Sequence, residues 1–348
     1  MILKTLWYNL FKFIIKCSLF FYTRRIIVKG KENIPKKGAV LFVVNHPNGL
    51  IDPLIVAVNN PRAQYFLVRA ASFKKPLIKR FLGSLNLMPI YRMRDGVKQL
   101  GNNKNVFEKC FTLLNNQNAL MIFPEGSHDK RRTIRNLSKG FSRIVFGALE
   151  RNPALQIHII PVGLTYQNPS VYPSNVCLHY GTPILVNDFY KPLIINSEIK
   201  RLKDVITSQL KTLSVHIPLD ENYEKILDKL TAANVDFTEV EQVNSMITST
   251  IISGREKKVN LVSFIKPFIL LNSIVPWIIW KHTESKINEF EFIDTFRYGI
   301  NTITVSVNFM IQTYLVSYFY SWLSGIIYLA SSLLLILFYS KFHPNYAK

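Results

Sequence analysis

Residues 39–53 read Ala-Val-Leu-Phe-Val-Val-Asn-His-Pro-Asn-Gly-Leu-Ile-Asp-Pro. The first six residues are apolar and rich in β-formers, and such a run predicts a buried strand. The strand ends before His46, because Pro47 removes a backbone donor. Asp52 followed by Pro53 is typical of a helix N-cap with proline at the first helical position. The stretch therefore predicts a histidine at the carboxyl end of a strand and an aspartate at the start of the next helix, where open α/β sheets keep their reactive groups.

The segments around this stretch alternate between the patterns of strands and helices. Strands alternating with helices predict an α/β fold, with a mostly parallel sheet covered by helices on both faces. We expect this domain to span residues 25–218. The predicted strands are 25–30, 39–44, 65–69, 87–91, 119–123, 156–165 and 176–180, and the predicted helices are 53–59, 73–82, 97–115 and 137–151.

The composition points to a membrane. The 348 residues carry a formal net charge of +21, which suggests an anionic partner. Residues 302–340 contain no Asp, Glu, Lys or Arg, a feature that a membrane protein needs and a soluble nucleic-acid-binding protein does not. We therefore expect membrane lipid, and no nucleic acid, as a partner. Cys17, Cys110 and Cys177 are too widely spaced for a metal site and predict a reducing compartment without disulfides.

Residues 1–24 form the first expected unit, a membrane-interface helix. Residues 1–22 are aromatic and apolar, and Lys12 and Lys16 lie one helical turn apart, so one face is basic. No small-residue cleavage site follows them. We interpret the segment as an uncleaved helix that lies in the interface, and a signal anchor that spans the bilayer is the alternative.

The composition changes again toward the C-terminus. Residues 219–258 are more polar and predict a helical linker, and residues 259–348 predict a C-terminal membrane region. Prolines interrupt the apolar stretch 261–280, which we expect to be re-entrant or interfacial, or a short hairpin. Residues 302–340 suffice for two transmembrane helices of roughly 18 residues each, with a tight turn near 321–325.

The charges that flank these two predicted spans indicate their orientation. Arg297 precedes the pair and Lys341 follows it. Two spans return the chain to the side on which it started, and positive residues mark that side as cytoplasmic. We therefore expect the folded domain on the cytoplasmic face of a membrane.

His46 and Asp52 are the first candidate reactive pair. Five residues separate them, so on one continuous helix they would point apart. They meet only if residues 47–51 bend, and Pro47 and Gly49 favour a bend. In that case His46 is a general base and the carboxylate sets its tautomer. The alternative is a loop histidine beside a helix cap.

Two further strand ends carry polar groups. Residues 123–132 read Phe-Pro-Glu-Gly-Ser-His-Asp-Lys-Arg-Arg, and backbone N–H groups beside Gly126 and Ser127 can hold an anion. Arg92 ends another predicted strand, and arginine suits bidentate contact with phosphate. The alternatives are a solvated charged turn in the first case and a salt-bridged surface arginine in the second.

Four blocks of the chain, taken in order, resemble the glycerophospholipid acyltransferase superfamily, which includes the glycerol-3-phosphate and 1-acylglycerol-3-phosphate acyltransferases. The segment around Lys139 is also similar to a lysine-glycine segment of that family. Two departures stand out: the His–Asp spacing is one residue longer than usual, and Ser-His replaces the usual Thr-Arg after Glu-Gly. The blocks are Asn45-His46…Asp52, Pro89-Ile90-Tyr91-Arg92, Phe123-Pro124-Glu125-Gly126-Ser127 and Ile160-Pro161-Val162-Gly163.

The resemblance implies an enzyme that moves a fatty acyl group from acyl-CoA or acyl-carrier protein to a hydroxyl of a phosphate-bearing acceptor. It implies that His46 is the general base and that Asp52 orients it. It implies no cofactor beyond the acyl donor, and no metal. The substrate-binding residues that it implies are Arg92, Glu125, Gly126, Ser127 and Lys139, with Glu125 organising the turn or orienting the acceptor.

We expect lysophosphatidic acid as the acceptor, with two related molecules as alternatives. A small single catalytic domain favours lysophosphatidic acid, whereas the long His–Asp spacing favours glycerol-3-phosphate, and a lyso-aminolipid uses the same hydroxyl chemistry. The alternative from another class is a non-catalytic membrane protein that binds lipid with the same fold.

Overall fold

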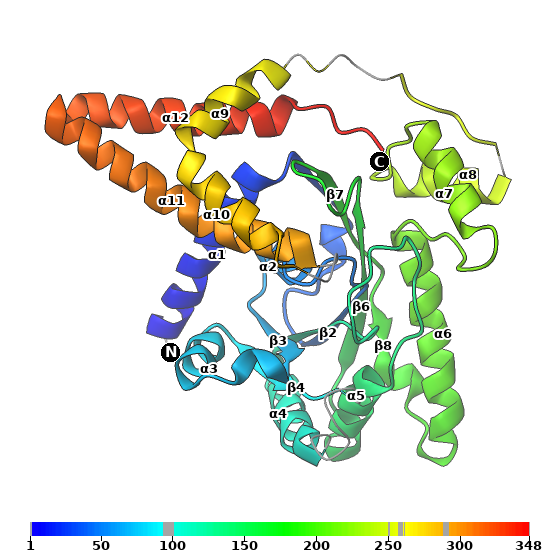
Figure 1. Cartoon of the computed structure of the whole chain (residues 1–348). Helices are drawn as coiled ribbons and strands as arrows, with labels where there is room; N and C mark the ends of the chain where they lie inside the picture. The colour runs from blue at the N-terminus through cyan, green and yellow to red at the C-terminus, as the bar shows by residue number, and fades with distance from the viewer. Residues whose placement is uncertain are drawn as a thin grey trace.

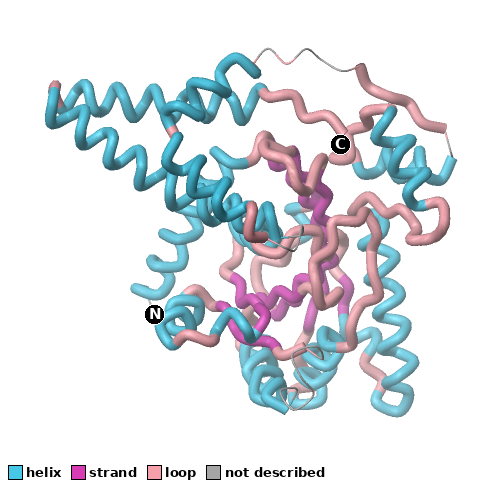
Figure 2. Tube along the Cα trace, in the orientation of Figure 1, coloured by secondary structure: helices cyan, strands magenta, loops and turns pink. Residues whose placement is uncertain are grey.

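The computed structural model describes residues 2–92, 101–249, 251–256, 260, 262–287 and 292–347 (Figure 1). Its centre is one eight-stranded sheet, and Figure 2 shows these strands surrounded by helices. The strand order is β1-β7-β6-β2-β5-β3-β4, and β8 pairs with β6. The strands are β1 Arg25–Lys29, β2 Ala39–Val44, β3 Gln64–Arg69, β4 Leu87–Ile90, β5 Ala119–Ile122, β6 Ile157–Tyr166, β7 Asn175–Tyr180 and β8 Ile184–Leu185.

The helices of this part of the chain follow the predicted alternation, and the α/β prediction is confirmed. The helix predicted at 97–115 is observed from Asn103 onward. Residues 97–100 of that prediction lie outside the described residues. The helices are α1 Ile2–Tyr22, α2 Ile51–Asn59, α3 Pro76–Ser84, α4 Asn103–Asn115, α5 Gly140–Arg151, α6 Ile195–Leu213, α7 Tyr223–Ala232 and α8 Val240–Ser249, with short 3₁₀ helices η1 Lys31–Asn33, η2 Ala70–Phe73, η5 Val186–Phe189 and η6 Pro192–Ile194.

The sheet is mostly parallel, as the alternation predicts. The pairs β2·β5, β2·β6, β3·β4, β3·β5 and β1·β7 are parallel, whereas β7 and β8 run antiparallel to β6. A parallel pair needs a crossover of a dozen or more residues. Only residues 167–174 connect β6 to β7, so β7 must turn back. The five strands β2, β3, β4, β5 and β6 remain parallel, and their carboxyl ends meet at one edge.

Strand β2 connects the two halves of the core. All six of its residues are fully buried. Because side chains alternate along a strand, Leu41 and Val43 join a cluster with α4, α5 and α6, while Val40 and Phe42 join a cluster with α1 and α2. Helices on both faces thus explain why this strand is an unbroken apolar run.

Helix α1 confirms the predicted N-terminal helix, and it also packs into the core of the sheet domain. Tyr8 and Leu19 are buried in the core cluster of α2. The Tyr8 hydroxyl accepts a hydrogen bond from the Gln64 N–H at the start of β3. The outer face exposes large apolar side chains such as Leu3, 82% exposed, and Phe13, 64% exposed. Membrane contact of this face stays a prediction.

The segment after β8 forms a small core of its own. Helices α7 and α8 pack around a cluster that contains Phe237 and Val240 and extends to Cys177 on β7 and Ala347 near the C-terminus. Residues 219–249, predicted as a helical linker, are therefore helical and packed against the sheet domain.

The C-terminal region is a hairpin that projects from the side of the sheet (Figure 1). The two helices predicted over 302–340 are confirmed, but their turn is at Tyr320–Ser321, slightly earlier than predicted, because Ser321 caps α12 by accepting from the Ser324 N–H. Two shorter helices precede them and are bent by 94°, in the stretch predicted to be re-entrant or a hairpin. These helices are α9 Lys266–Asn272, which follows η7 Ser263–Ile265, α10 Ile274–Glu284, α11 Ile293–Phe319 and α12 Trp322–Phe342.

Among the described residues, only α12 is by itself long and apolar enough to cross a membrane, with a mean hydropathy of 1.9. The bent segment Ser263–Glu284 would be a second candidate if it formed one span. Helix α11 is more polar, and its Asn308 and Gln312 donate to the Asn272 carbonyl of α9. That the hairpin crosses a bilayer stays a prediction.

Candidate active site

The carboxyl ends of the parallel strands gather the predicted reactive residues. His46 follows β2, Arg92 follows β4, and Glu125 follows β5. All three line one cavity of about 1810 Å³, together with Gly126, Ser127 and Lys139. The structure thus brings the predicted substrate-binding residues to one place, beside the histidine.

His46 and Asp52 form the predicted pair. Nδ1 of His46 lies 2.9 Å from Oδ2 of Asp52. A carboxylate only accepts, so Nδ1 carries the proton and Nε2 is left to accept one. The ring stacks on Phe123, with centroids 4.1 Å apart, and this stacking fixes its plane. The geometry is that of a general base with its orienting carboxylate.

Asp52 is fully buried and accepts two more hydrogen bonds. The Asn48 N–H donates to Oδ2 at 2.6 Å, and the Tyr166 hydroxyl donates to Oδ1 at 2.6 Å. Burial raises the pKa of Asp52, and the bonds from His46 and Tyr166 oppose that rise. The sequence predicted β6 only as far as Thr165, so Tyr166 was missed. Its position at the carboxyl end of a central strand was the available signal.

The predicted N-cap role of Asp52 is wrong. Helix α2 begins at Ile51, so Asp52 lies inside its first turn. The Asn48 side chain takes the capping role, because its Oδ1 accepts from the N–H groups of Leu50 and Ile51. With Asn48 as the cap, the Asp52 carboxylate turns back to His46, and the longer His–Asp spacing is accommodated.

The bend itself is tied to the sheet. The Asn45 side chain makes two hydrogen bonds with the backbone of Leu164 on β6, at 3.0 and 2.7 Å. These bonds continue the pairing of β2 and β6 beyond the last paired residue of β2. His46 is therefore carried by a rigid strand end.

The turn after β5 is built around an ion pair that the sequence did not predict. Gly126 has a φ of 76°, a conformation that favours glycine. The Arg135 guanidinium donates to Oε2 of Glu125 from Nε at 3.0 Å and from Nη2 at 2.6 Å, and its Nη1 donates to the Ser127 hydroxyl at 2.7 Å. Burial raises the pKa of Glu125, and Arg135 opposes the rise. Arg135 thus provides the cation of this block.

Sequence reasoning could not select Arg135. Residues 130–135 contain four cations, and only the folded loop shows which of them turns inward. One prediction fails at the same turn. The Gly126 N–H donates to the Phe123 carbonyl at 3.2 Å and closes the turn, so it is not directed at an anion.

Several basic groups line the cavity. Nη1 of Arg92 donates to the Gly126 carbonyl at 2.6 Å, which joins the second block to the third. Lys139 and Arg143 lie one turn apart at the start of α5, and both line the cavity. Cations at a helix N-terminus form an environment suited to phosphate.

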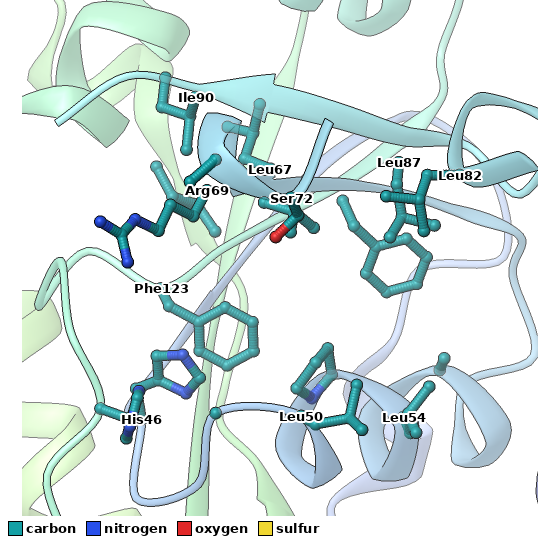
Figure 3. Close-up of a pocket in the computed structure, with 18 of the residues that line it drawn as sticks. His46, Leu50, Leu54, Leu67, Arg69, Ser72, Leu82, Leu87, Ile90 and Phe123 are labelled. Atoms are coloured by element: carbon teal, nitrogen blue, oxygen red, sulfur yellow. The ribbon is translucent and has the colours of Figure 1, made fainter. Parts of the chain in front are cut away.

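Most of the remaining cavity lining is apolar, although Lys12, Arg69 and Lys104 also line it. Figure 3 shows His46 and Phe123 at one end and Leu82 and Leu87 toward the other. Helices α1 and α11 complete its wall. Among the residues that the structure describes, no three His, Cys, Asp or Glu side chains cluster as metal ligands do. Apolar residues of the wall include Phe11, Ile15, Leu54, Leu67, Phe107 and Ile303.

Comparison with known proteins places these blocks in a family. Residues 25–165, which contain all four blocks, match the family model described as Acyltransferase. Glycerol-3-phosphate O-acyltransferase 1 of Saccharomyces cerevisiae is 28% identical over 115 residues, which cover 32% of this chain and 15% of the yeast protein. The chain therefore spans a small part of that relative's length.

Two bacterial proteins are also similar. The 1-acyl-sn-glycerol-3-phosphate acyltransferase of Borreliella burgdorferi is 24% identical over 210 residues, which cover 58% of this chain and 78% of that protein. The crystal structure of the 1-acyl-sn-glycerophosphate (LPA) acyltransferase PlsC from Thermotoga maritima aligns with a TM-score of 0.39 and 18% identity, over 54% of this chain and 72% of that one.

Proposed function

We propose that the protein moves a fatty acyl group from a thioester to a glycerol hydroxyl of a phosphate-bearing acceptor, and the match of residues 25–165 to the family model described as Acyltransferase supports this proposal. The observation that carries the proposal is the His46–Asp52 pair, whose histidine lines a mostly apolar cavity that Arg92, Lys139 and Arg143 also line. These cations suit the acceptor phosphate, and the apolar lining suits an acyl chain.

The chemistry follows from the tautomer of His46. Nε2 takes the proton from the acceptor hydroxyl as its oxygen attacks the thioester carbonyl. Asp52 stabilises the imidazolium, and the C–S bond breaks as the new C–O ester bond completes. The imidazolium then returns the proton to the departing thiolate. Proton transfer of this kind contributes roughly 100- to 10,000-fold to the rate.

We propose lysophosphatidic acid as the acceptor. The Borreliella burgdorferi protein, named as a 1-acyl-sn-glycerol-3-phosphate acyltransferase, matches over 78% of its length, which supports this choice. The cavity volume of about 1810 Å³ is also large enough for more than one aliphatic chain. The yeast relative, named as a glycerol-3-phosphate O-acyltransferase, supports glycerol-3-phosphate as the second candidate.

The proposed setting is the cytoplasmic face of a membrane. Helices α1 and α12 expose large apolar side chains, and the net charge of +21 favours anionic lipid and an acidic acyl carrier. An acceptor that is itself a lipid would reach the cavity from the bilayer, while acyl-CoA or acyl-carrier protein would arrive from the cytosol.

The test uses the purified full chain in vesicles that contain anionic lipid. Radiolabelled acyl-CoA or acyl-carrier protein is offered with lysophosphatidic acid, glycerol-3-phosphate or a lyso-aminolipid, and the labelled lipid product is separated and counted. We expect transfer to lysophosphatidic acid. Transfer only to another acceptor would overturn the choice of acceptor, and transfer to none would overturn the enzymatic proposal.

A further inference from the structure

The start of helix α11 lies against the bend that carries His46, although α11 is outside the matched segment 25–165. Nδ2 of Asn48 donates to Oδ2 of Asp294 at 3.3 Å. A methyl group added to Gly49 would lie 3.4 Å from the Thr295 hydroxyl. Two successive residues of the bend are therefore in contact with two successive residues of α11.

Asn48 is the residue through which this contact reaches the reactive pair. Its side-chain oxygen caps α2, and its side-chain nitrogen faces Asp294, so both ends of the amide are held. Its backbone N–H donates to Oδ2 of Asp52 at 2.6 Å. Oδ2 of Asp52 also accepts the hydrogen bond from Nδ1 of His46. A shift of Asn48 would therefore displace the carboxylate that orients the base.

Asp294 is a firm anchor for Asn48. It is 4% exposed, and its Oδ1 accepts from the Tyr22 hydroxyl of α1 at 3.1 Å. The same oxygen pairs with Nη2 of Arg297 at 2.9 Å, and that guanidinium also donates to the Ser170 carbonyl. These contacts leave Oδ2 directed at Asn48, and they join α1, α11 and the loop after β6 in one buried network.

Helix α11 also faces the cavity directly. Within the described residues, the Thr295 hydroxyl is buried without a hydrogen-bond partner. The Phe292 ring packs edge-on against His128, with centroids 4.7 Å apart, and His128 in turn neighbours His46. The residues of α11 and its N-cap that line the cavity are Phe292, Thr295, Tyr298, Gly299, Thr302 and Ile303.

We infer that Asp294 is a positioning residue of the acyl-transfer site, which holds the His46–Asp52 pair in place through Asn48. The start of the C-terminal hairpin then belongs to the active site, although sequence similarity ends long before it. The inference rests on the proposed function, since it assigns a role in acyl transfer.

The experiment measures kcat and KM of acyl transfer in vesicles for variants on both sides of the Asn48–Asp294 contact. Asp294→Ala is expected to lower kcat about 10- to 100-fold with little change in KM, because small misplacements of reacting groups cost up to that much. Asn48→Asp, which sets two carboxylates against each other but keeps an oxygen to cap α2, is expected to do the same. The exchange Asn48→Asp/Asp294→Asn restores a donor–acceptor pair with unchanged net charge and is expected to recover most of kcat.

Asn308→Ala is the matched control, because it removes a hydrogen bond from α11 to the Asn272 carbonyl of α9 that involves neither Asp294 nor Asn48, and it is expected to leave kcat within about twofold. Failure of the exchange to recover kcat, or an unchanged kcat in Asp294→Ala, overturns the inference while the function stands. If the wild-type protein transfers no acyl group, or His46→Ala transfers as fast as the wild type, the proposed function and this inference both fall. Circular dichroism checks that each variant is folded, and the recovery by exchange does not depend on Asp294→Ala.

Discussion

The turns after β2 and β5 are neighbours with similar sequences and different electrostatics. Each leaves a buried parallel strand through a proline and a glycine, and each carries a buried carboxylate. In the first turn, Asp52 pairs with His46, and histidine is the side chain that most often serves as a general base. In the second turn, Glu125 pairs with Arg135, whose charge is permanent. The comparison assigns proton transfer to the first turn and a fixed shape to the second.

The largest expected effect is at the first turn. His46→Ala should lower kcat of acyl transfer about 100- to 10,000-fold, because it removes the general base. The fold should remain, since the side chain lines the cavity. His128→Ala is the control, because this second histidine lies next to His46, and His46 is the histidine paired with Asp52. A larger loss of kcat in His128→Ala than in His46→Ala would reverse the assignment of the base.

The next effect is at the second turn. Arg135→Met leaves Glu125 buried without its cation, and breaking such a pair lowers the free energy of unfolding by about 3 kcal/mol. The double variant Glu125→Gln/Arg135→Met should regain part of this stability. Arg131→Met removes a more exposed pair with Asp129 and should change the stability by less than about 1 kcal/mol.

Denaturant unfolding in detergent measures these differences. In the same samples, Arg135→Met should raise the KM for the acceptor more than it lowers kcat, because the turn that carries Ser127 loses its shape. A loss confined to kcat would mean that Glu125 and Arg135 take part in proton transfer, and the contrast between the two turns would be wrong.

A smaller effect on kcat is expected from Tyr166, which contacts the first turn, and none from Tyr223, which lies near the second. Tyr166→Phe removes the hydrogen bond to Oδ1 of Asp52 and should lower kcat about tenfold, since a hydrogen bond to a charged group contributes about 1.5 kcal/mol. Tyr223→Phe removes a hydroxyl that accepts from the Arg132 N–H near the second turn, and it should leave kcat unchanged. Equal effects of the two changes on kcat would contradict the comparison.

The smallest expected effect is a pH dependence of the folding stability, which comes from His216 near the second turn. Nδ1 of His216 accepts from the Ile134 N–H, next to Arg135. Burial, with help from Lys211, lowers the pKa of His216 from 6.5 to about 4, so the folded state prefers the neutral ring. Unfolding therefore takes up a proton between these pH values. Stability is full above about pH 6.5 and declines as the pH falls toward about 4.

Because His216 is partly exposed, the loss should be only about 1 kcal/mol. Denaturant midpoints at several pH values measure it, and in His216→Gln, which keeps an acceptor, the midpoint should vary less with pH over this range. An identical pH dependence in the wild type and the variant would show that other groups are responsible.

The sequence by itself determined the elements and the reactive edge. Alternating apolar runs predicted the strands and their helices, because a strand buried on both faces has no polar positions. His46, Arg92 and Glu125 each came just after a predicted strand, so they could be placed on one edge without a structure. The short connections after β6, by contrast, decided that β7 and β8 run antiparallel to β6. Local hydrogen bonding gave the capping role at α2 to Asn48 and not to Asp52.

Only the tertiary structure identified the partners of the reactive residues. Tyr166 and Arg135 are 114 and 10 residues from the carboxylates that they contact, and Asp294 is 246 residues from Asn48. Strand and helix patterns report local periodicity, and they contain no information on which distant side chain turns inward. Burial of a carboxylate demands a partner, but packing selects it, and here it selected residues from β6, a loop and the C-terminal hairpin.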